Sequence, residues 1–528
     1  MDNAPWWQGA TVYHIYVRSF CDSNEDGIGD LDGVRSRLDY LSGLGVDALW
    51  LSPLHPSPNV DWGYDVADYQ AIHPDLGTLE AFRQLIDEAH ARGLKILMDE
   101  VLSHTSSAHP WFQESIACGQ TADWYVWANP RADGGPPNNW LSVFGGPAWT
   151  YHPARRQYYH HKFFAAQPKL NWHNRLARAA ALGVLRHWLD FGVDGFRLDV
   201  ANTFVHDRAL RDNPPLDPNS RSDFHWAHAP RLQHNRFDAN RPENAPALRD
   251  IRQLIDAYPG AFVFGEFSED PRAANAYVGP EALHSGYTFD LLHLNRFEAP
   301  HLAQLLQAGS DFAGNAPCWT FSNHDVARAP SRLFAGLEPG IRDRASAAYL
   351  MVLFCLAGTV LLYQGEELGL EETAITDPVA VKDPLGKLAF GHFAGRDGCR
   401  TPIPWTTDEP NCGFSRADPW TVMPAYGPER CAFENAPTRA LVQRLIALRR
   451  AEPALHAGSM EAIAAQGPVL SFTRRQGAET CRVLVNTSAA SLTLDKGLEG
   501  DILLAINGAE PGYLPGFGGL IARGSPRP

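Results

Sequence analysis

The stretch Gly195-Phe196-Arg197-Leu198-Asp199-Val200 decides how the rest of the chain is interpreted. It has the apolar character of a short buried strand, and it carries an arginine and an aspartate two residues apart. Alternate residues of a strand share a face, so Arg197 and Asp199 are expected to point the same way. A neighbouring guanidinium lowers the pKa of a carboxyl group and favours its ionised form. An ionised aspartate can attack a sugar carbon, although a purely structural ion pair would have the same sequence.

Seven other short apolar segments have the character of strands, and amphipathic helical patterns follow them. The eight predicted strands are Thr11–Phe20, Ala48–Pro53, Lys95–Val101, Gly195–Val200, Phe262–Phe267, Tyr287–Leu292, Cys318–Asp325 and Thr359–Gly365. The helical patterns include Leu31–Leu44, Leu79–Arg92, Leu248–Tyr258 and Ile341–Leu356. Alternation of strand and helix repeated eight times predicts an α/β fold, a (β/α)8 TIM barrel.

Two segments interrupt this alternation of strands and helices, and near the end of the chain the pattern changes to short strands alone. Residues 104–172 are rich in aromatic residues, Pro, Gly and Asn, and are too long for a simple loop, which predicts a small insertion subdomain after the third strand. Residues 202–244 are polar and predict a long irregular loop, a candidate lid. Short strands with turns predict a C-terminal all-β sandwich. The predicted domains are the barrel, 1–103 and 173–450, the insertion, 104–172, and the sandwich, 451–528.

Composition excludes several classes of partner. The 528 residues carry a formal net charge of −15, whereas nucleic acids and anionic membranes attract basic patches. No segment reaches the roughly 18 consecutive apolar residues of a membrane helix, and residues 1–10 lack the pattern of a signal peptide. Eight cysteines without a CxxC pair favour reduced thiols and a cytoplasmic location. The expected partner is a small molecule, and the chain is expected to be a monomer or homodimer.

Acidic residues gather at the predicted carboxyl ends of four strands, where barrel enzymes place their active sites. Those ends read Asp99-Glu100-Val101-Leu102-Ser103-His104, Arg197-Leu198-Asp199, Phe264-Gly265-Glu266 and Ser322-Asn323-His324-Asp325. Burying acids without partners costs on the order of several kcal/mol each, so a shared chemical role is a better explanation than packing. Glycoside hydrolysis needs one carboxylate that attacks and one carboxylic acid that donates a proton.

Each acid has a predicted role in that chemistry. Asp199 is the candidate nucleophile because of its neighbouring arginine. The apolar neighbours of Glu266 in the sequence favour a protonated carboxyl group and therefore a proton donor. Asp325 is expected to hydrogen-bond to sugar hydroxyls and to stabilise positive charge in the transition state.

With these four motifs in this order, the chain resembles glycoside hydrolase family 13, the α-amylase family, and within it the α-glucosidases. The resemblance implies a retaining mechanism in which Asp199 is the nucleophile, Glu266 the general acid/base and Asp325 the transition-state stabiliser. It also implies that the glucosyl ring is held by His104, Arg197 and His324.

Other motifs resemble those of exo-acting oligosaccharide α-glucosidases. In Asp61-Trp62-Gly63-Tyr64-Asp65, the resemblance assigns Asp61 to hydroxyl binding and Tyr64 to stacking under the terminal glucose. In Gly395-Arg396-Asp397-Gly398-Cys399-Arg400-Thr401-Pro402, it places Arg396 at the substrate. In Gln167-Pro168-Lys169-Leu170-Asn171, a lysine stands where the family more often has aspartate. Together with Ser103, Lys169 argues against the calcium site that amylases have between barrel and insertion.

A separate metal site is expected in Asp22-Ser23-Asn24-Glu25-Asp26-Gly27-Ile28-Gly29-Asp30, which offers oxygen ligands at alternate positions. Gly33 occupies the twelfth position, so the loop is not an EF-hand. The resemblance implies a structural Ca²⁺, or Mg²⁺, and the alternative is a loop without metal. The predicted ligands are Asp22, Asn24, Asp26, the carbonyl of Ile28, and Asp30.

The predicted substrate is maltose or a short oligosaccharide, with glucosyl transfer to alcohol or phenol acceptors. Phe144 and Phe163 are candidates for an apolar acceptor wall, and plain packing is an equal alternative. Val200, directly after the nucleophile, is typical of enzymes that cleave α-1,6 bonds, so an oligo-1,6-glucosidase remains an alternative. A sucrose- or trehalose-type isomerase on the same fold is another, and a non-catalytic binding protein is a remote one.

Overall fold

Strand β7, which contains Arg197, lies inside an eight-stranded parallel sheet. The computed structural model describes residues 5–217, 232–268, 274–310, 317–393, 395–494 and 497–524. The sheet order is β10-β11-β1-β2-β3-β7-β8-β9, and every neighbouring pair is parallel. The strands are β1 (Thr11–Ile15), β2 (Ala48–Leu51), β3 (Lys95–Glu100), β7 (Gly195–Leu198), β8 (Phe262–Phe267), β9 (Ser285–Thr288), β10 (Cys318–Trp319) and β11 (Thr359–Tyr363). All eight predicted strands are present, and the TIM barrel is confirmed.

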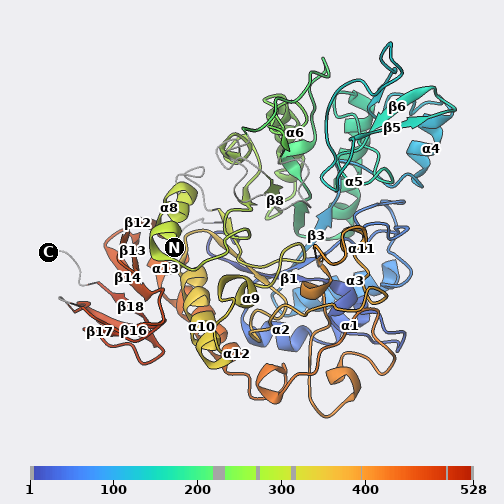
Figure 1. The fold of residues 1–528 in the computed structure, drawn as a ribbon. Coiled ribbons are helices and arrows are strands. Elements are labelled where there is room, and N and C mark those ends of the chain that lie inside the picture. Colours follow the sequence, from blue (N-terminus) through green and yellow to red (C-terminus); the bar gives the residue numbers. More distant parts are fainter. Residues whose placement is uncertain are drawn as a thin grey trace.

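Helices surround this sheet (Figure 1). They are α1 (Leu31–Arg35), α2 (Leu38–Leu44), α3 (Leu79–Ala91), α4 (Pro110–Ile116), α5 (Arg175–Phe191), α6 (Asn244–Ile255), α8 (Ala299–Ser310), α9 (Ala329–Leu333), α10 (Pro339–Cys355), α11 (Pro384–Leu388), α12 (Pro437–Ala451) and α13 (Pro453–His456). Leu79–Ala91 shows why such a segment is helical: Thr78 caps its first turn by accepting a hydrogen bond from the amide of Ala81, and its apolar stripe is buried.

The observed elements differ from the predicted ones mainly at their ends. Strand β1 ends at Ile15 instead of Phe20. The backbone amides of the next two residues donate to side chains and not to the backbone of a neighbouring strand. Gln364 Oε1 accepts the amide of Tyr16, and Ser52 Oγ accepts that of Val17. The predicted helix Leu31–Leu44 is two short helices, since the backbone leaves helical geometry at Arg37. Such breaks depend on tertiary contacts, which local patterns do not encode.

The barrel interior is a separate hydrophobic cluster. Its members come from seven strands and from the turn after β9: Val12, Ala48, Trp50, Leu97, Phe262, Phe264, Tyr287, Leu292, Cys318 and Leu361. Trp6 and Trp7 pack against this cluster. Alternate strand residues therefore fill the barrel, as in other TIM barrels, while the remaining ones pack against the helices.

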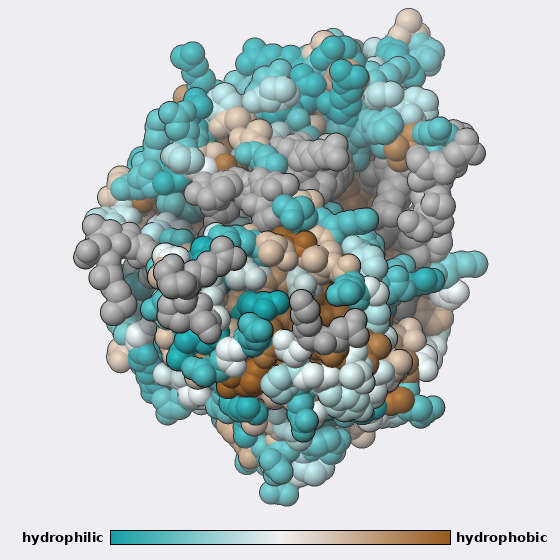
Figure 2. Space-filling view, turned by 90° about the vertical axis from the view of Figure 1, so that its left-hand side faces the viewer, coloured by the Kyte–Doolittle hydropathy of each residue, from teal (hydrophilic) through white to brown (hydrophobic). Residues whose placement is uncertain are grey.

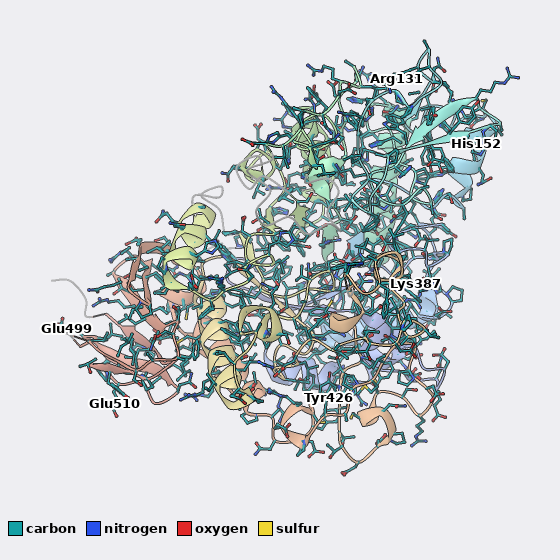
Figure 3. The ribbon with its side chains drawn as sticks, viewed as in Figure 1. Arg131, His152, Lys387, Tyr426, Glu499 and Glu510 are labelled. Carbon is teal, nitrogen blue, oxygen red and sulfur yellow. The ribbon has the colours of Figure 1, made fainter. Side chains whose placement is uncertain are left out.

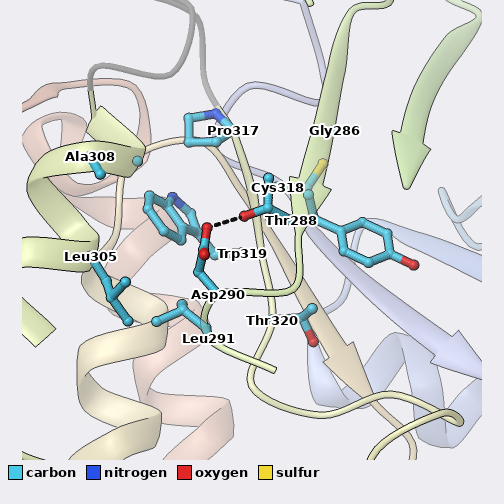
Figure 4. A pocket seen from close by; sticks show the side chains of 12 residues that line it. Gly286, Thr288, Asp290, Leu291, Leu305, Ala308, Pro317, Cys318, Trp319 and Thr320 are labelled. Atoms are coloured by element: carbon cyan, nitrogen blue, oxygen red, sulfur yellow. Dashed lines mark hydrogen bonds between the residues drawn. The ribbon is translucent and has the colours of Figure 1, made fainter. Parts of the chain in front are cut away.

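The barrel has a seam between β9 and β10, where no hydrogen-bonded pairing joins the two strands within the described ranges. A cavity of about 40 Å³ lies at this seam, bounded by residues of β9, of α8 and of β10. In Figure 4, Thr288 and Asp290 lie across it from Leu305 and Ala308 of α8, and the Thr288 hydroxyl donates to Asp290 Oδ2 at 2.7 Å. The cavity is large enough for about one water molecule.

The insertion after β3 forms its own small sheet, of β4 (Trp127–Ala128), β5 (Trp149–His152) and β6 (Gln157–His160) in the order β4-β6-β5. Its residues hydrogen-bond to the described part of the predicted 202–244 loop. Asn139 Nδ2 donates to the Asn213 carbonyl at 2.9 Å, and Trp140 Nε1 to the Arg211 carbonyl at 2.9 Å. Residues 218–231 of that predicted lid lie outside the described part of the chain.

The C-terminal segment is antiparallel β-structure, as predicted. One sheet has the order β12-β13-β14-β18-β16, and a second pairs β15 with β17. The strands are β12 (Ser459–Gln466), β13 (Val469–Gln476), β14 (Glu479–Asn486), β15 (Leu492–Thr493), β16 (Asp501–Ile506), β17 (Tyr513–Leu514) and β18 (Gly519–Arg523). Glu499 and Glu510 mark this domain in Figure 3, and Arg131 and His152 mark the insertion at the opposite end of the molecule.

On the face turned toward the viewer in Figure 2, hydrophobic residues gather toward the middle and hydrophilic residues toward the rim. Across the described residues, the helices are all too short or too polar to traverse a bilayer.

We expect Gly195→Ala to prevent normal packing of β7. Gly195 has a φ of +150°, and an added Cβ would lie 1.8 Å from the carbonyl oxygen of Phe262 in the next strand. The free energy of unfolding should fall by at least about 3 kcal/mol, measurable by denaturant titration. Gly183→Ala is the control: nothing lies within 4 Å of its added Cβ in helix α5, so it should raise stability by about 0.5–1 kcal/mol. Equal effects of the two substitutions would contradict this account.

Candidate active site

The Arg197 guanidinium is the centre of the site. It is fully buried in β7, and it contacts one carboxylate from each of the neighbouring strands β3 and β8 and one just after β7. Its Nη1 lies 2.7 Å from Asp99 Oδ1 and 2.8 Å from Asp199 Oδ1. Its Nη2 lies 2.9 Å from Glu266 Oε2. The predicted proximity of Arg197 and Asp199 is therefore observed, and the same guanidinium also reaches the other candidate catalytic acid.

Glu266 is held by polar groups. Its Oε2 accepts the amide of Val200 at 3.0 Å, and its Oε1 accepts the Tyr287 hydroxyl at 3.1 Å. The Tyr287 hydroxyl in turn accepts a hydrogen bond from Arg197 Nη2 at 3.0 Å. The predicted apolar setting of Glu266 is wrong: its sequence neighbours are apolar, but its carboxyl group contacts Arg197, the Tyr287 hydroxyl and a backbone amide.

The charge balance of this cluster favours a bound proton. Three buried carboxyl groups share one guanidinium. Burial raises the pKa of Asp99 to about 6, although Arg197 lowers it. Burial also raises the pKa of Asp199 well above its ordinary value, and Arg197 offsets this only in part. The predicted lowering of the Asp199 pKa is therefore wrong, because desolvation outweighs the single arginine. The raised pKa values of Asp99 and Asp199 favour a proton shared within this cluster.

Asp325 lies in the opposite electrostatic environment. Burial alone would raise its pKa, but His324, Arg396 and Arg400 hold it below its usual range. Its Oδ1 lies 3.1 Å from Arg396 Nη1 and 3.0 Å from Arg400 Nη2. Burial lowers the pKa of His324 to about 3, so the imidazole is neutral at neutral pH and the two arginines keep Asp325 ionised. About a quarter of the Asp325 side chain is exposed, so its carboxylate can reach a ligand.

Tyr64 joins these two centres. Its hydroxyl donates to Asp99 Oδ2 at 2.9 Å and lies 2.6 Å from His324 Nε2. Because the single hydroxyl proton goes to Asp99, a neutral His324 must donate its Nε2 proton to Tyr64. The Tyr64 and His324 rings stack with centroids 5.2 Å apart.

A second arginine, Arg396, organises the predicted sugar-binding groups. Its Nη2 lies 2.7 Å from Asp61 Oδ1 and 2.8 Å from Asp383 Oδ1. Gln167 Nε2 donates to Asp61 Oδ2 at 3.1 Å and lies 3.2 Å from His104 Nε2. Asp61, His104 and Arg396 are therefore brought together as the sequence predicts, and the glutamine fixes two of them.

The two predicted wall residues adjoin this network. Phe144 and Phe163 have centroids 5.7 Å apart. The Arg396 guanidinium lies 5.5 Å from the Phe144 ring, and the His104 ring lies 5.2 Å from Phe163. Phe144 also stacks on Phe164 at 4.2 Å, so packing and an acceptor wall are both compatible with its position.

Sequence reasoning missed several contributors. Tyr287 and Trp50 were included only in strands, although Trp50 Nε1 donates to Asp99 Oδ2 at 3.2 Å. Asp383 lies in a segment without any motif. Arg400 belongs to the Arg396 motif but received no role, and the second arginine of that motif, four residues after Arg396, was the available signal.

The predicted metal ligands lie together in the loop before α1, and their side-chain oxygens accept hydrogen bonds from the loop and from Ser415. Asp22 Oδ2 accepts the amide of Gly27 at 2.8 Å and the Ser415 hydroxyl at 2.6 Å. Asp26 Oδ1 accepts the amide of Ile28 at 2.8 Å, and Asn24 Nδ2 donates to Asp26 Oδ2 at 3.1 Å. Asp30 caps α1.

In the part of the chain that the structure describes, no three His, Cys, Asp or Glu side chains converge as a metal site would require. Calcium binding by this loop stays a prediction.

Lys169 is buried where the insertion meets the loop after β7. Its Nζ donates to the carbonyl of Thr203. Burial and the nearby Lys162 lower the pKa of Lys169 from 10.5 to about 7. Lys162 itself forms a 2.6 Å ion pair with buried Asp238. A basic side chain with an amide-type acceptor thus occupies the position where the family more often has aspartate.

Comparisons with known proteins agree with this geometry. A family model described as the catalytic domain of α-amylase matches residues 14–458. A probable α-glucosidase of Rhizobium meliloti (strain 1021) is 42% identical over 545 aligned residues, covering 98% of this chain and 97% of that protein.

Solved structures are similar over the whole length. The α-glucosyl transfer enzyme XgtA is similar with a TM-score of 0.92 and 42% identity, over 99% of this chain and 100% of that one. The trehalulose synthase MutB of Pseudomonas mesoacidophila MX-45 is similar with a TM-score of 0.87 and 30% identity, over 99% and 100%.

If the loop before α1 binds calcium, Ca²⁺ added to chelator-treated protein should raise the melting temperature by about 2–4 °C at 100 times its Kd. Asp26→Ala should abolish this rise, because it removes one exposed carboxylate of the loop. Glu25→Gln, in the same loop but outside the predicted ligand set, is the control and should keep the rise. The same scans with Mg²⁺ identify the preferred ion. An unchanged melting temperature with both ions would contradict metal binding.

We expect Lys169→Met to remove part of the pH dependence of stability. Folded Lys169 takes up its proton only below about pH 7, whereas the unfolded lysine is protonated below its ordinary value near 10.4. Raising the pH from 7 to 9 therefore stabilises the folded wild type through this residue. Thermal scans should show a smaller gain in melting temperature over this range for Lys169→Met. Lys387→Met, at an exposed position, should leave the gain unchanged, and equal gains in all three proteins would refute the interpretation.

Proposed function

Because the chain belongs to the α-amylase family of glycoside hydrolases, we propose that it is a retaining, exo-acting α-glucosidase. In this proposal it cleaves the non-reducing terminal glucosyl residue of maltose or short oligosaccharides, and it transfers glucose to alcohol acceptors as well as to water. The observation that carries the proposal is that one buried guanidinium binds the carboxyl groups of both Asp199 and Glu266.

That shared guanidinium keeps the two acids close, which fits a covalent mechanism. Retaining glycosidases place their carboxyl groups about 5–5.5 Å apart, while inverting enzymes leave room for a water molecule between them. In the first step, Asp199 forms a bond to the anomeric carbon. The glycosidic carbon–oxygen bond breaks, and the Glu266 proton moves to the leaving oxygen. In the second step, Glu266 takes a proton from water or an alcohol, which displaces Asp199.

Asp325 supports these steps electrostatically. Two arginines keep it ionised, so it can stabilise positive charge that develops on the sugar ring. The Arg396 guanidinium bridges Asp325 to Asp61. Groups for the reacting carbon and for the sugar hydroxyls are therefore fixed in one network, which suits binding of a single terminal glucose.

Transfer to alcohols is supported by the aromatic residues beside Arg396. Phe144 and Phe163 would offer an apolar surface to an acceptor, and XgtA, an α-glucosyl transfer enzyme, is 42% identical to this chain. The α-1,6-cleaving alternative rests on Val200, whose amide binds Glu266. Isomerisation is a further alternative, since MutB is a trehalulose synthase. A cytoplasmic location and a monomeric or dimeric state stay predictions.

Product analysis with maltose, isomaltose and sucrose tests the proposal. We expect glucose from maltose, released first as the α-anomer in time-resolved NMR, because two displacements restore the configuration. β-Glucose would contradict the retaining mechanism. Asp199→Ala should lower kcat by at least about 10³-fold. Asp190→Ala is the matched control, since the exposed Asp190 accepts the Tyr258 hydroxyl on the outer layer and its loss should keep full activity. The ranking of the three sugars decides the linkage, and a rearranged disaccharide from sucrose would favour the isomerase.

A further inference from the structure

We propose that Tyr287 is a positioning residue that stabilises the Glu266 carboxylate as its proton passes to the leaving group. The inference rests on the proposed role of Glu266 as proton donor. Tyr287 lies in β9, directly paired with Glu266 of β8. Its hydroxyl lies 3.0 Å from Arg197 Nη2 and 3.1 Å from Glu266 Oε1. No motif or comparison assigns a role to this tyrosine.

The direction of the hydrogen bonds follows from the number of protons. A guanidinium only donates, so Arg197 donates to the Tyr287 oxygen. Burial raises the pKa of Tyr287 well above its ordinary value, so the phenol keeps its proton. That single proton is directed at Glu266 Oε1. The two hydrogen bonds are thus donated in one direction, from Arg197 to Tyr287 and from Tyr287 to Glu266.

The same contacts determine which oxygen of Glu266 holds the transferable proton. Oε2 accepts the amide of Val200 and lies 2.9 Å from Arg197 Nη2, so donors already surround it. The proton therefore belongs on Oε1, the oxygen that also accepts the Tyr287 hydrogen bond. When Oε1 gives its proton to the leaving oxygen, the Tyr287 hydroxyl stabilises the negative charge left behind. Losing this bond removes that stabilisation, which matters most for poor leaving groups.

The hydroxyl can be removed without disturbing the packing. The Tyr287 ring belongs to the interior cluster, with centroids 6.2 Å from Trp50 and 6.4 Å from Phe264. Only 2% of the residue is exposed. Tyr287→Phe keeps this ring and deletes only the oxygen that binds Glu266 and Arg197.

The experiment compares substrates that need different amounts of acid assistance. The measured quantity is kcat/KM, which reports the first step, for maltose, 4-nitrophenyl α-glucoside and α-glucosyl fluoride. Fluoride leaves with little protonation. Tyr287→Phe should lower kcat/KM for maltose by about 10- to 100-fold, the nitrophenyl glucoside by less, and the fluoride by no more than about threefold. An equal fall for all three would overturn the inference, and so would no fall for maltose.

Tyr13→Phe is the matched control. Tyr13 is a fully buried tyrosine of strand β1 whose hydroxyl donates to a carboxylate, Glu367 Oε1, at 2.7 Å, away from the catalytic acids. Its removal should not change the ratio between maltose and the fluoride. A changed ratio in Tyr13→Phe would show that loss of any buried hydroxyl produces the pattern, and it would overturn the inference.

Glu266→Gln separates this inference from the proposed function. If Glu266 is the acid, Glu266→Gln should lose maltose cleavage and retain most kcat/KM for the fluoride. If it does so while Tyr287→Phe shows no selectivity, only the role of Tyr287 fails. If Glu266→Gln affects all three substrates equally, the acid role itself fails.

Discussion

The ion pairs of Arg197 are the interaction on which the active site depends. A single guanidinium inside the barrel contacts carboxyl groups from β3, from β8 and from the residue that follows β7. Without it, three buried acids would face one another, and their desolvation would oppose folding. With it, the cluster is stable but still short of positive charge, and this shortage keeps a proton in the site.

In the second half of the site, the carboxylate of Asp325 contacts more positive charge than the negative charge it carries. Around Asp325, two arginines form ion pairs with one partly exposed carboxylate. This acid therefore stays ionised, while the cluster around Arg197 holds a proton. Tyr64 lies between the two halves and hydrogen-bonds to Asp99 of one and His324 of the other. Acids of the same chemical type thus receive different protonation states from their surroundings, which is the condition for acid and electrostatic roles in one site.

The sequence predicted the barrel and the acids because both depend on local patterns. Strand-forming segments and the polar residues at their ends are short stretches of sequence. Their order along the chain shows which strand of the barrel each one forms. It could not predict the environment of Glu266: the flanking Phe264 and Phe267 suggested an apolar setting, whereas Arg197, Tyr287 and the amide of Val200 surround the carboxyl group. Asp383 was missed for the same reason, since its partner Arg396 is thirteen residues away and only the fold brings them together.

The position of β1 in the sheet has a consequence for the order of assembly. β1 pairs with β2 on one side and with β11 on the other, so the first strand of the barrel borders its last strand. While the ribosome is still translating the middle of the chain, β1 has one exposed edge, and it keeps that edge until residues 359–363 emerge from the exit tunnel. Unpaired strand edges attract other chains, and long chains expose them for longest during synthesis. The strand order that completes the active site therefore leaves one edge of β1 without its sheet partner for most of synthesis.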